Sequence, residues 1–295
     1  MREPVFTGAC TALVTPFDDS GAINYDAFAA QIDAQIDSGI DALCVCGTTG
    51  ESSTMSIREH IAAVEFCVKH VNHRVKVIAG AGSNDTSAAV YLCQHAQDSG
   101  ADALLLVTPY YNKCSQTGLI KHYEYIADRV ELPIILYNVP SRTGVSFTAE
   151  TYQVLSKNPR FNGVKEASGN FSLLAHTRFL CGDDFYIWSG NDDQVVPMMS
   201  LGAKGVISVA ANIVPKVMVE MTHLCLDNDI AAASKLQVEY MDLIDALFIE
   251  VNPIPIKAAM DLMGMKAGGL RLPLCDISPA HLETLRASMQ RMGLL

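Results

Sequence analysis

Eight short apolar runs, most of them separated by segments with helical periodicity, constrain the fold of this chain more than any other feature. Several runs are continuously hydrophobic, such as the Ala-Leu-Leu-Leu-Val sequence that begins at Ala103. Continuous rather than alternating runs are typical of strands that are covered on both faces, as in parallel sheets. The runs occupy residues 11–17, 41–47, 75–82, 101–110, 133–140, 161–168, 185–192 and 204–210.

A short repeat supports one recurring strand–helix unit. The sequence Ser-Gly-Ile-Asp-Ala-Leu at residues 38–43 recurs as Ser-Gly-Ala-Asp-Ala-Leu at residues 99–104, and each copy has the form of a helix stop, a turn and a strand start. Eight such units predict an α/β fold, a (β/α)8 TIM barrel, rather than an open doubly wound sheet. No Gly-x-Gly-x-x-Gly sequence follows the first run, which weakens the dinucleotide-binding alternative.

The pattern changes after Asn212, where amphipathic helices follow one another without strands between them. They are predicted at residues 215–227, 230–248, 255–264 and 278–292. The first of them completes the barrel and the others form a C-terminal helical appendage. We therefore expect a catalytic barrel domain at residues 1–224 and a helical domain at residues 225–295.

Charge and cysteine usage limit the partners of the protein. The formal net charge of −11 argues against nucleic acid or an anionic membrane as the main partner. The nine cysteines are odd in number, scattered and free of C-x-x-C pairs, as expected for reduced thiols in the cytoplasm. Residues 1–14 show no signal-peptide pattern, and no run approaches the ~18 apolar residues of a membrane span. We expect a cytoplasmic protein.

Lys165 is the most informative single residue. It lies near the carboxyl end of the apolar run 161–168, where burying an unpaired ammonium costs several kcal/mol or forces it to lose its proton. Proteins accept that cost mainly where a neutral amine acts as a nucleophile, although a lysine can also extend its charged head to water. The chemistry of a barrel lies at the carboxyl ends of its strands. Of the eleven lysines only Lys165 is near such an end, whereas Lys76 and Lys204 begin predicted strands.

Two neighbouring segments offer groups that could act with this lysine. The second run is followed by Gly47-Thr48-Thr49-Gly50-Glu51-Ser52, whose N–H groups and hydroxyls could cradle a carboxylate or phosphate; an ordinary glycine turn is the alternative. The segment lacks the spacing and the lysine of a phosphate-binding P-loop.

The fifth run carries Tyr137, on the strand next to that of Lys165, so its hydroxyl could reach the amine. Arg142 follows in the loop and offers a bidentate fork for a carboxylate. Packing in the barrel is the alternative interpretation of Tyr137, and a solvent-exposed charge is the alternative for Arg142. Tyr110 and Tyr111, after the fourth run, are expected to be exposed, in a subunit contact or a turn. No convincing metal site is present, because His70 and His73 have no carboxylate at ligand spacing.

With these residues in view, the chain resembles the dihydrodipicolinate synthase family of the pyruvate-dependent Schiff-base aldolase superfamily, nearly from end to end. The resemblance rests on long motifs in the same order. They are the Gly-Thr-Thr-Gly-Glu-Ser sequence at 47–52, Val-Thr-Pro-Tyr-Tyr-Asn at 107–112, Leu-Tyr-Asn-Val-Pro-Ser-Arg-Thr-Gly at 136–144, Gly-Val-Lys-Glu-Ala-Ser-Gly-Asn at 163–170, Ser-Gly at 189–190 and Asn-Pro-Ile-Pro-Ile-Lys at 252–257.

The resemblance implies catalytic roles for four residues. Lys165 would form an imine with pyruvate, and Tyr137 would shuttle protons as the carbinolamine dehydrates and the enamine forms. Thr48 would link Tyr137 to Tyr111, which in the family reaches into the site of a neighbouring subunit. Such a hydroxyl relay needs no metal and no cofactor other than the covalent imine.

The resemblance also implies the substrate contacts. Thr49 would bind the carboxylate of pyruvate, and Arg142 that of the second substrate, L-aspartate 4-semialdehyde. The backbone around Gly190 and Ile207 would line the pocket. The implied activity is 4-hydroxy-tetrahydrodipicolinate synthase, which serves lysine and diaminopimelate biosynthesis, in a homotetramer built as a dimer of dimers.

A lysine-binding effector site is only partly matched. Family members inhibited by lysine tend to have a histidine and a glutamate where this chain has Ile57 and Ala88. The matching positions are Ser52, His60, Asn84 and Tyr110. Because an ammonium loses its acidic partner, we expect weak or absent inhibition by lysine.

Two alternatives stay open. N-acetylneuraminate lyases and 2-keto-3-deoxy sugar acid aldolases share the imine chemistry, so Lys165 and Tyr137 would serve either; Thr48 and the Ser-Arg-Thr-Gly sequence at 141–144 favour the synthase. A non-catalytic binding or scaffold protein on a barrel is the third hypothesis, and it predicts no covalent adduct with pyruvate.

Overall fold

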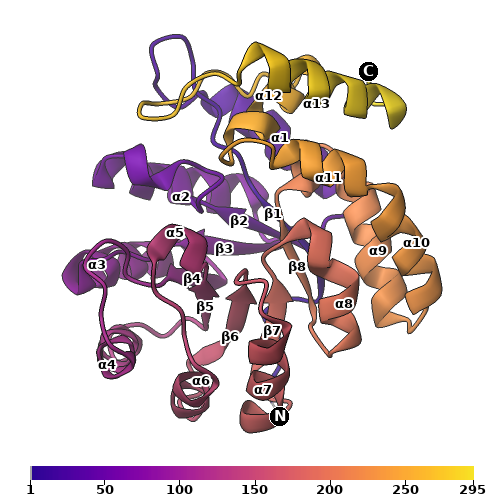
Figure 1. Ribbon diagram of the computed structural model, residues 1–295. Helices are drawn as coiled ribbons and strands as arrows, with labels where there is room; N and C mark the ends of the chain where they lie inside the picture. Colours follow the sequence, from indigo (N-terminus) through magenta and orange to yellow (C-terminus); the bar gives the residue numbers. More distant parts are fainter. Residues whose placement is uncertain (1) are drawn as a thin grey trace.

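Eight parallel strands close into a barrel in the computed structural model, which describes residues 2–295 (Figure 1). Each strand pairs with its neighbours in sequence order, and the first pairs with the last. This confirms the predicted (β/α)8 fold. The strands are β1 (Gly8–Ala12), β2 (Ala42–Val45), β3 (Lys76–Gly80), β4 (Ala103–Val107), β5 (Ile134–Asn138), β6 (Phe161–Glu166), β7 (Tyr186–Ser189) and β8 (Gly205–Ser208).

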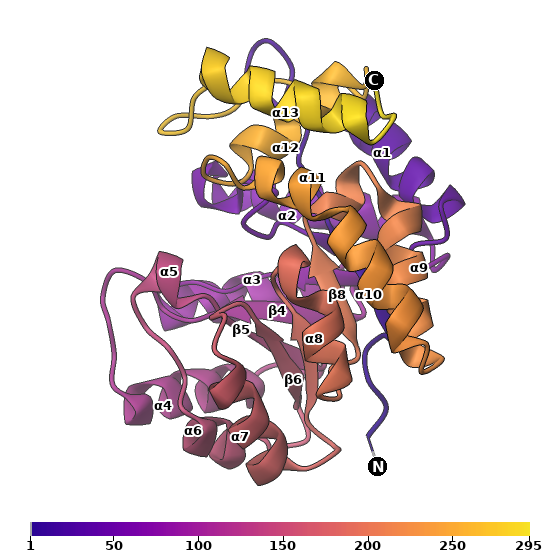
Figure 2. The ribbon, with the colours of Figure 1, turned by 45° about the vertical axis from the view of Figure 1, so that its right-hand side comes forward.

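Among residues 2–295, eight helices surround the barrel, one after each strand, and short helical turns interrupt four of the loops (Figures 1 and 2). The surrounding helices are α1 (Tyr25–Asp37), α2 (Ile57–Val71), α3 (Thr86–Asp98), α4 (Gln116–Ala127), α6 (Ala149–Leu155), α7 (Phe171–Cys181), α8 (Val195–Ser200) and α9 (Pro215–Leu226). The loop after β5 holds the one-turn helix α5 (Pro140–Thr143). The 3-10 turns are η1 (Ser52–Thr54), η2 (Asp192–Gln194) and η3 (Ala210–Asn212).

Local capping explains where several of these helices begin. The side chain of Asn24 accepts a hydrogen bond from the backbone N–H of Ala27 at the start of α1. Ser56 and Glu59 form the predicted capping box at the start of α2, each side chain bonding the other residue's backbone N–H. The carboxylate of Glu59 is thereby held at the start of α2.

The C-terminal helices begin beside α8 and α9 at the side of the barrel and end with the two helices that lie at one end of the molecule (Figures 1 and 2). They are α10 (Ile230–Glu239), α11 (Met241–Leu247), α12 (Ile254–Leu262) and α13 (Pro279–Arg291). The single helix predicted at residues 230–248 is wrong, because the chain leaves the helical conformation at Tyr240 and continues as a second helix.

The proposed division into domains at residues 1–224 and 225–295 stays a prediction. The boundary falls in the last turn of α9, and residue 1 lies outside the described residues.

The first strand begins earlier than predicted. Residues 11–17 are all buried, but only Gly8–Ala12 belongs to the strand. Beyond it the backbone N–H of Val14 donates to the side chain of Asn212, and the hydroxyl of Thr15 donates to the carbonyl of Gly50. Burial alone therefore misplaced this strand, since side-chain and carbonyl partners outside the sheet satisfy the later residues.

The interior of the barrel is a packed core rather than a channel. Apolar residues from alternating strand positions fill it, including Ile78, Ile135, Trp188 and Ile207, all with no measurable exposure. The ring of Trp188 stacks on Phe6, with 5.2 Å between the ring centroids. A filled interior leaves space for a ligand only at an end of the barrel.

His122 on α4 makes stability depend on pH. Its side chain is buried, one ring nitrogen contacts the hydroxyl of Thr86 at 2.9 Å, and burial lowers its pKa from 6.5 to about 4. The unfolded chain thus takes up a proton below pH 6.5 while the folded chain does not until about pH 4. The free energy of unfolding should fall by up to about 3 kcal/mol as the pH is lowered through that window. It should level off below it.

Denaturant unfolding of wild type and His122→Gln between pH 7.5 and 4 tests this expectation. The difference between the two proteins isolates His122, because other groups titrate equally in both. A stability difference that stays constant over this pH range would contradict the prediction.

Among residues 2–295 no helix combines the length and the apolar character that crossing a bilayer requires.

Candidate active site

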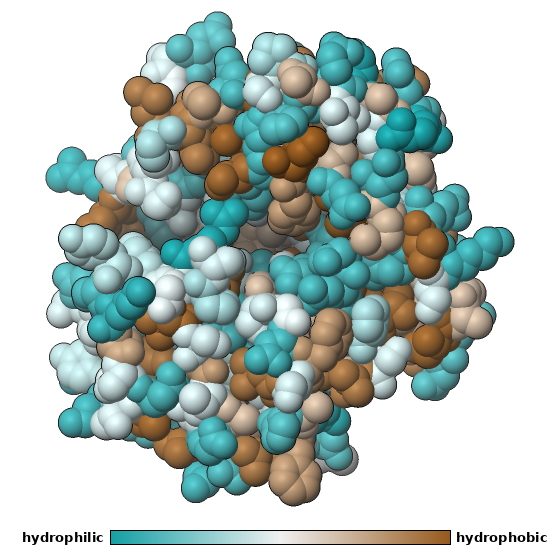
Figure 3. Space-filling view, viewed as in Figure 1, coloured by the Kyte–Doolittle hydropathy of each residue, from teal (hydrophilic) through white to brown (hydrophobic). Residues whose placement is uncertain are grey.

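A cavity of about 170 Å³ opens where the carboxyl ends of the strands meet. Figure 3 shows a hollow near the centre of this face, below the C-terminal helices. Residues from four strands or the loops that follow them contribute the polar lining, and the C-terminal helices close one side. The lining includes Thr48, Thr49, Tyr137, Arg142, Lys165, Gly190 and Asn252.

Lys165 lies at the floor of this cavity, one residue before the end of β6. Its side chain is inside the protein, with 6% of the residue exposed, so the charged-head-in-water alternative does not apply. None of the ion pairs formed by residues 2–295 involves it. The amine is therefore sheltered from bulk water and makes no ion pair in this part of the chain, which is the kind of surroundings in which proteins place nucleophilic lysines.

Tyr137 is the nearest functional neighbour of this amine. The two residues are direct partners in the pairing of β5 with β6, and the amine nitrogen lies 4.6 Å from the centroid of the tyrosine ring. Both side chains line the cavity. The prediction that the two residues lie on adjacent strands and close to one another is confirmed.

A pair of buried polar residues on the outer face of the same strands fixes this arrangement. Asn138 follows Tyr137, Glu166 follows Lys165, and the amide nitrogen of Asn138 donates to both carboxylate oxygens at 3.0 and 3.1 Å. Tyr152 donates its hydroxyl to the same carboxylate at 3.1 Å. Because neighbouring strand residues point to opposite faces, this outer pair locks the register that sets the inner pair. Burial raises the pKa of Glu166, and these hydrogen bonds oppose the rise.

Gly190 leaves the space that the side chain of Lys165 occupies. A Cβ atom at position 190 would lie 3.1 Å from Cε of Lys165 and 2.6 Å from Cβ of Ala167. Gly190 lines the cavity, and this close approach gives a steric reason for a glycine at the position.

Gly190→Ala should therefore displace the amine. We expect kcat/KM to fall by about a hundredfold, because a shift of about 1 Å in a reacting group has this order of effect. Steady-state kinetics together with circular dichroism would measure it. A folded variant with wild-type kinetics would show that the lysine tolerates the added methyl group.

The Gly47–Glu51 loop brings two threonines to the cavity. Backbone hydrogen bonds from Gly50 to Gly47 and from Glu51 to Thr48, both 3.1 Å, fold the loop into a tight turn. Thr48 and Thr49 line the cavity, and the hydroxyl oxygen of Thr49 accepts a hydrogen bond of 3.0 Å from the side chain of Asn252. The loop can therefore present hydroxyl and N–H groups to an anion.

Arg142 lies at the other side of the opening, on α5. Its guanidinium donates to the backbone carbonyl of Asn252 at 3.1 Å and lines the cavity while the residue remains exposed. No carboxylate of residues 2–295 pairs with it. A bidentate donor is thus free to bind an anionic group at the entrance.

Two predicted site residues lie elsewhere in the structure. Tyr111 is 93% exposed, has a φ of 70° and does not line the cavity. Ile207 lies in the barrel interior, and Val209 lines the cavity in its place. The roles assigned to these two residues stay predictions.

The residues of the partly matched effector site fall around the loops that follow β2, β3 and β4. Asn84 donates its side-chain amide to the carbonyl of Tyr110 at 3.0 Å, so these two are brought together. His60 is buried, its Nε2 lies 2.7 Å from the carbonyl of Gly80, and burial lowers its pKa. Ser52 is half-buried in η1. The ring of His60 therefore has a structural partner already.

The sequence interpretation missed the residues that the segment between α11 and α12 contributes. Asn252 and Phe248 line the cavity, and so does Cys44 from inside the barrel. Asn252 stands in the quoted motif at 252–257, where an asparagine before two prolines in an apolar stretch was the available signal. Burial raises the pKa of Cys44 to about 11, so this thiol stays protonated at neutral pH.

In the part of the chain that the structure describes, no group of three or more His, Cys, Asp or Glu residues is arranged to hold a metal ion.

A barrel with a buried lysine, a tyrosine and anion-binding groups in one cavity at the carboxyl ends of its strands has the arrangement of a barrel enzyme. The chain belongs to the dihydrodipicolinate synthetase family, whose model matches residues 5–292.

Individual relatives agree along their whole length. A 4-hydroxy-tetrahydrodipicolinate synthase from Acetivibrio thermocellus is 48% identical over 295 residues, which cover 100% of both chains. A crystal structure described as chloride-inhibited dihydrodipicolinate synthase from Acinetobacter baumannii complexed with pyruvate is 39% identical, with a TM-score of 0.96 over 98% of this chain and 99% of that one. The enzyme from Cyanidioschyzon merolae, described with lysine bound, is also 39% identical, with a TM-score of 0.96 over 99% and 100% of the two chains.

Proposed function

We propose that this protein is a 4-hydroxy-tetrahydrodipicolinate synthase that condenses pyruvate with L-aspartate 4-semialdehyde. The observation that carries the proposal is the amine of Lys165, which lies in a cavity beside Tyr137 and forms none of the ion pairs found among residues 2–295. The pyruvate described in the Acinetobacter baumannii relative supports the choice of keto acid. The product would serve lysine and diaminopimelate biosynthesis in the cytoplasm.

The first half of the reaction follows from the amine. The nitrogen of Lys165 attacks the keto carbon of pyruvate, the carbinolamine loses water, and a protonated imine forms. This imine withdraws electrons, so a methyl proton can leave and an enamine results. The hydroxyl of Tyr137, whose ring centroid lies 4.6 Å from the amine, would give the proton that departs with water and take up another.

The second half joins the two substrates. The enamine carbon attacks the aldehyde carbon of the semialdehyde, whose amino group then closes the ring on the imine carbon and releases Lys165. Thr48 and Thr49 would hold the carboxylate of pyruvate near the floor, and Arg142 the carboxylate of the semialdehyde at the entrance. A local arginine is needed, since a net charge of −11 repels anions at long range.

The exposed Tyr111 supports an assembly in which subunits share the site. Its residue is 93% exposed and does not line the cavity of its own chain, and its backbone has a left-handed conformation that is strained for a tyrosine. We propose that it reaches the cavity of a neighbouring subunit, where Thr48 would connect it to Tyr137, in a homotetramer. Sedimentation that shows a fully active monomer would contradict this assembly.

Borohydride reduction in the presence of pyruvate, followed by peptide mass mapping, tests the proposed function. We expect one modified peptide, with the reduced adduct on Lys165, and less labelling when the semialdehyde is added and consumes the enamine. No adduct with pyruvate would refute the proposal. Product from N-acetylmannosamine but not from the semialdehyde would assign the chain to the lyase branch of the superfamily.

Inhibition by lysine should be weak or absent in this protein. Ile57, which stands in place of the histidine, is 51% exposed and offers no hydrogen bond, and Ala88 offers no carboxylate to an ammonium group. We expect less than about tenfold loss of rate at lysine concentrations that saturate inhibited relatives, because a charge-assisted hydrogen bond contributes on the order of 1.5–3 kcal/mol. Steady-state assays with a lysine titration would decide this, and strong inhibition would refute it.

A further inference from the structure

The Gly47–Glu51 loop depends on a residue that does not line the cavity. Glu51 has a φ of 54°, a left-handed conformation that is uncommon for a residue with a side chain. Such a conformation persists only where the surroundings hold it. The contacts of Glu51 therefore decide where the two threonines of the loop lie.

Lys257 of α12 supplies the main contact. Its ammonium nitrogen lies 2.7 Å from the carboxylate of Glu51, and the two side chains are only 2% and 1% exposed. The same nitrogen donates to the carbonyl of Gly269 at 2.7 Å and lies 4.2 Å from the centroid of the Phe17 ring. Burial lowers the pKa of Lys257, and the charge of Glu51 opposes the shift. Burying both charges is costly, so the pair fixes geometry more than it adds stability.

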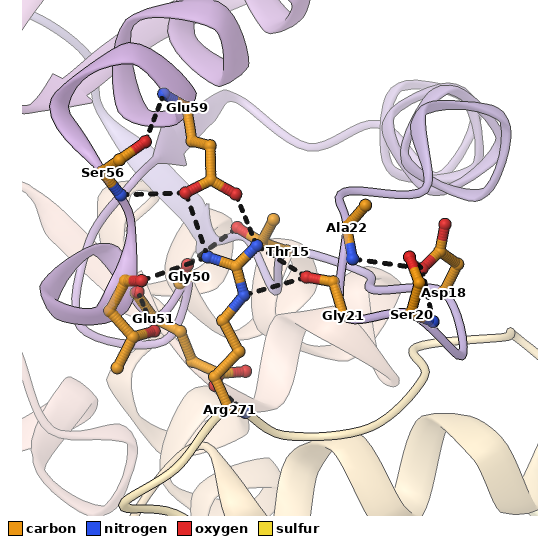
Figure 4. A network of polar contacts seen from close by, with 11 residues as sticks. Thr15, Asp18, Ser20, Gly21, Ala22, Gly50, Glu51, Ser56, Glu59 and Arg271 are labelled. Atoms are coloured by element: carbon orange, nitrogen blue, oxygen red, sulfur yellow. Dashed lines mark hydrogen bonds and ion pairs between the residues drawn. The ribbon is translucent and has the colours of Figure 1, made fainter.

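The segment of residues 267–271 also contacts the Gly47–Glu51 loop. The backbone N–H of Arg271 donates to the second carboxylate oxygen of Glu51 at 3.1 Å. Figure 4 shows the guanidinium of Arg271 between Glu59 of α2 and the carbonyl of Gly21, at 2.6 and 2.7 Å. The carboxylate of Glu59 also accepts a hydrogen bond from Ser56, and these contacts lower its pKa to about 2.

The same C-terminal segment also reaches the cavity directly, through the hydrogen bond from Asn252 to Thr49. Asn252 and Lys257 stand at the two ends of one short stretch that begins α12. The loop is thus held at Thr49 and at Glu51 by residues outside the barrel strands.

We propose that Glu51 and Lys257 are positioning residues: their ion pair holds the Gly47–Glu51 loop so that Thr48 and Thr49 meet the carboxylate of a keto acid bound at Lys165. This inference rests on the proposed keto-acid site. The two residues act through the threonines, because neither lines the cavity.

Two variants separate positioning from folding. In the double variant Glu51→Gln/Lys257→Met both charges are removed, so no unpaired charge stays buried, and the melting temperature should approach that of the wild type. Glu51→Asp keeps the charge but shortens its reach by one methylene group. In both variants the loop moves, and the pyruvate concentration that gives half-maximal borohydride trapping should rise by about tenfold or more. Trapping is measured at the same interval below each variant's melting temperature.

Asp242→Asn is the matched control. It breaks an exposed ion pair of 2.6 Å with Arg291 between α11 and α13, while the remaining amide oxygen can still accept the hydrogen bond that Ser288 donates to Asp242. We expect its melting temperature and its half-saturating pyruvate concentration to equal those of the wild type, since exposed pairs contribute little.

The outcomes divide cleanly. A folded double variant or Glu51→Asp variant with wild-type half-saturation would overturn the proposal, and so would loss of folding in both, which would make the pair a requirement of the fold alone. Labelling of the wild type at Lys165 with unaffected variants would remove the positioning role and leave the proposed function intact. No labelling of the wild type would remove both.

Discussion

Replacing Lys165 with methionine should abolish covalent capture of pyruvate and lower turnover by at least about a thousandfold, the order of loss seen when a nucleophile is removed. Methionine keeps most of the length of the side chain and suits a site of which 6% is exposed. Stability should therefore change little or increase, because a buried amine is replaced by an apolar group. Borohydride trapping and steady-state turnover measure the two effects, and a thermal melt reports the third.

Lys76→Met is the matched control for this experiment. Lys76 begins β3 at the opposite end of the barrel and forms an exposed ion pair of 2.8 Å with Asp102. The control should keep both trapping and turnover. If Lys165→Met retained a pyruvate adduct on another lysine, the proposed imine site would be wrong.

Removing only the hydroxyl of Tyr137 should lower turnover by about a hundredfold to ten-thousandfold, the usual contribution of a positioned proton donor or acceptor. Tyr137→Phe keeps the ring that packs 4.6 Å from the amine of Lys165, so the position of the amine is preserved. The imine should still form, but more slowly, because the carbinolamine loses its proton donor. Single-turnover trapping with pyruvate separates this slow step from a loss of binding.

Tyr123→Phe makes the same chemical change at a place outside the cavity. Tyr123 is buried on α4 and donates its hydroxyl to the carbonyl of Leu106 at 3.3 Å. This variant should lose about 1 kcal/mol of stability and none of its rate. Equal rate losses in the two variants would mean that the hydroxyl of Tyr137 acts only through the fold.

The elements of the fold that depend on residues close together in the sequence could be predicted from the sequence. Continuous apolar runs located seven of the eight strands closely, since burial on both faces and pairing coincide there. Burial and strand pairing do not coincide at the first run, where the backbone N–H of Val14 donates to the side chain of Asn212 instead of to a neighbouring strand. The predicted strand was therefore shifted along the chain. The contact of Lys165 with Tyr137 could be predicted because strand order alone makes them neighbours.

Contacts between distant parts of the chain could not be predicted in the same way. Asn252 and Thr49 are 203 positions apart, and no periodicity or spacing rule links a loop of the barrel to the start of a late helix. The pair of Glu51 and Lys257 has the same character. The motifs at residues 47–52 and 252–257 were both recognised in the sequence. Only the folded chain shows that residues of the second bond to residues of the first.

The cavity is lined by two parts of the chain that lie far apart in the sequence. Lys165 and Tyr137 belong to the strands, whereas Phe248 and Asn252 come from the segment between α11 and α12, which follows the barrel. Substitutions near position 250 could therefore change the specificity for the second substrate without altering Lys165 and Tyr137. Exchange of that short segment between related enzymes is therefore a direct route to altered second-substrate choice.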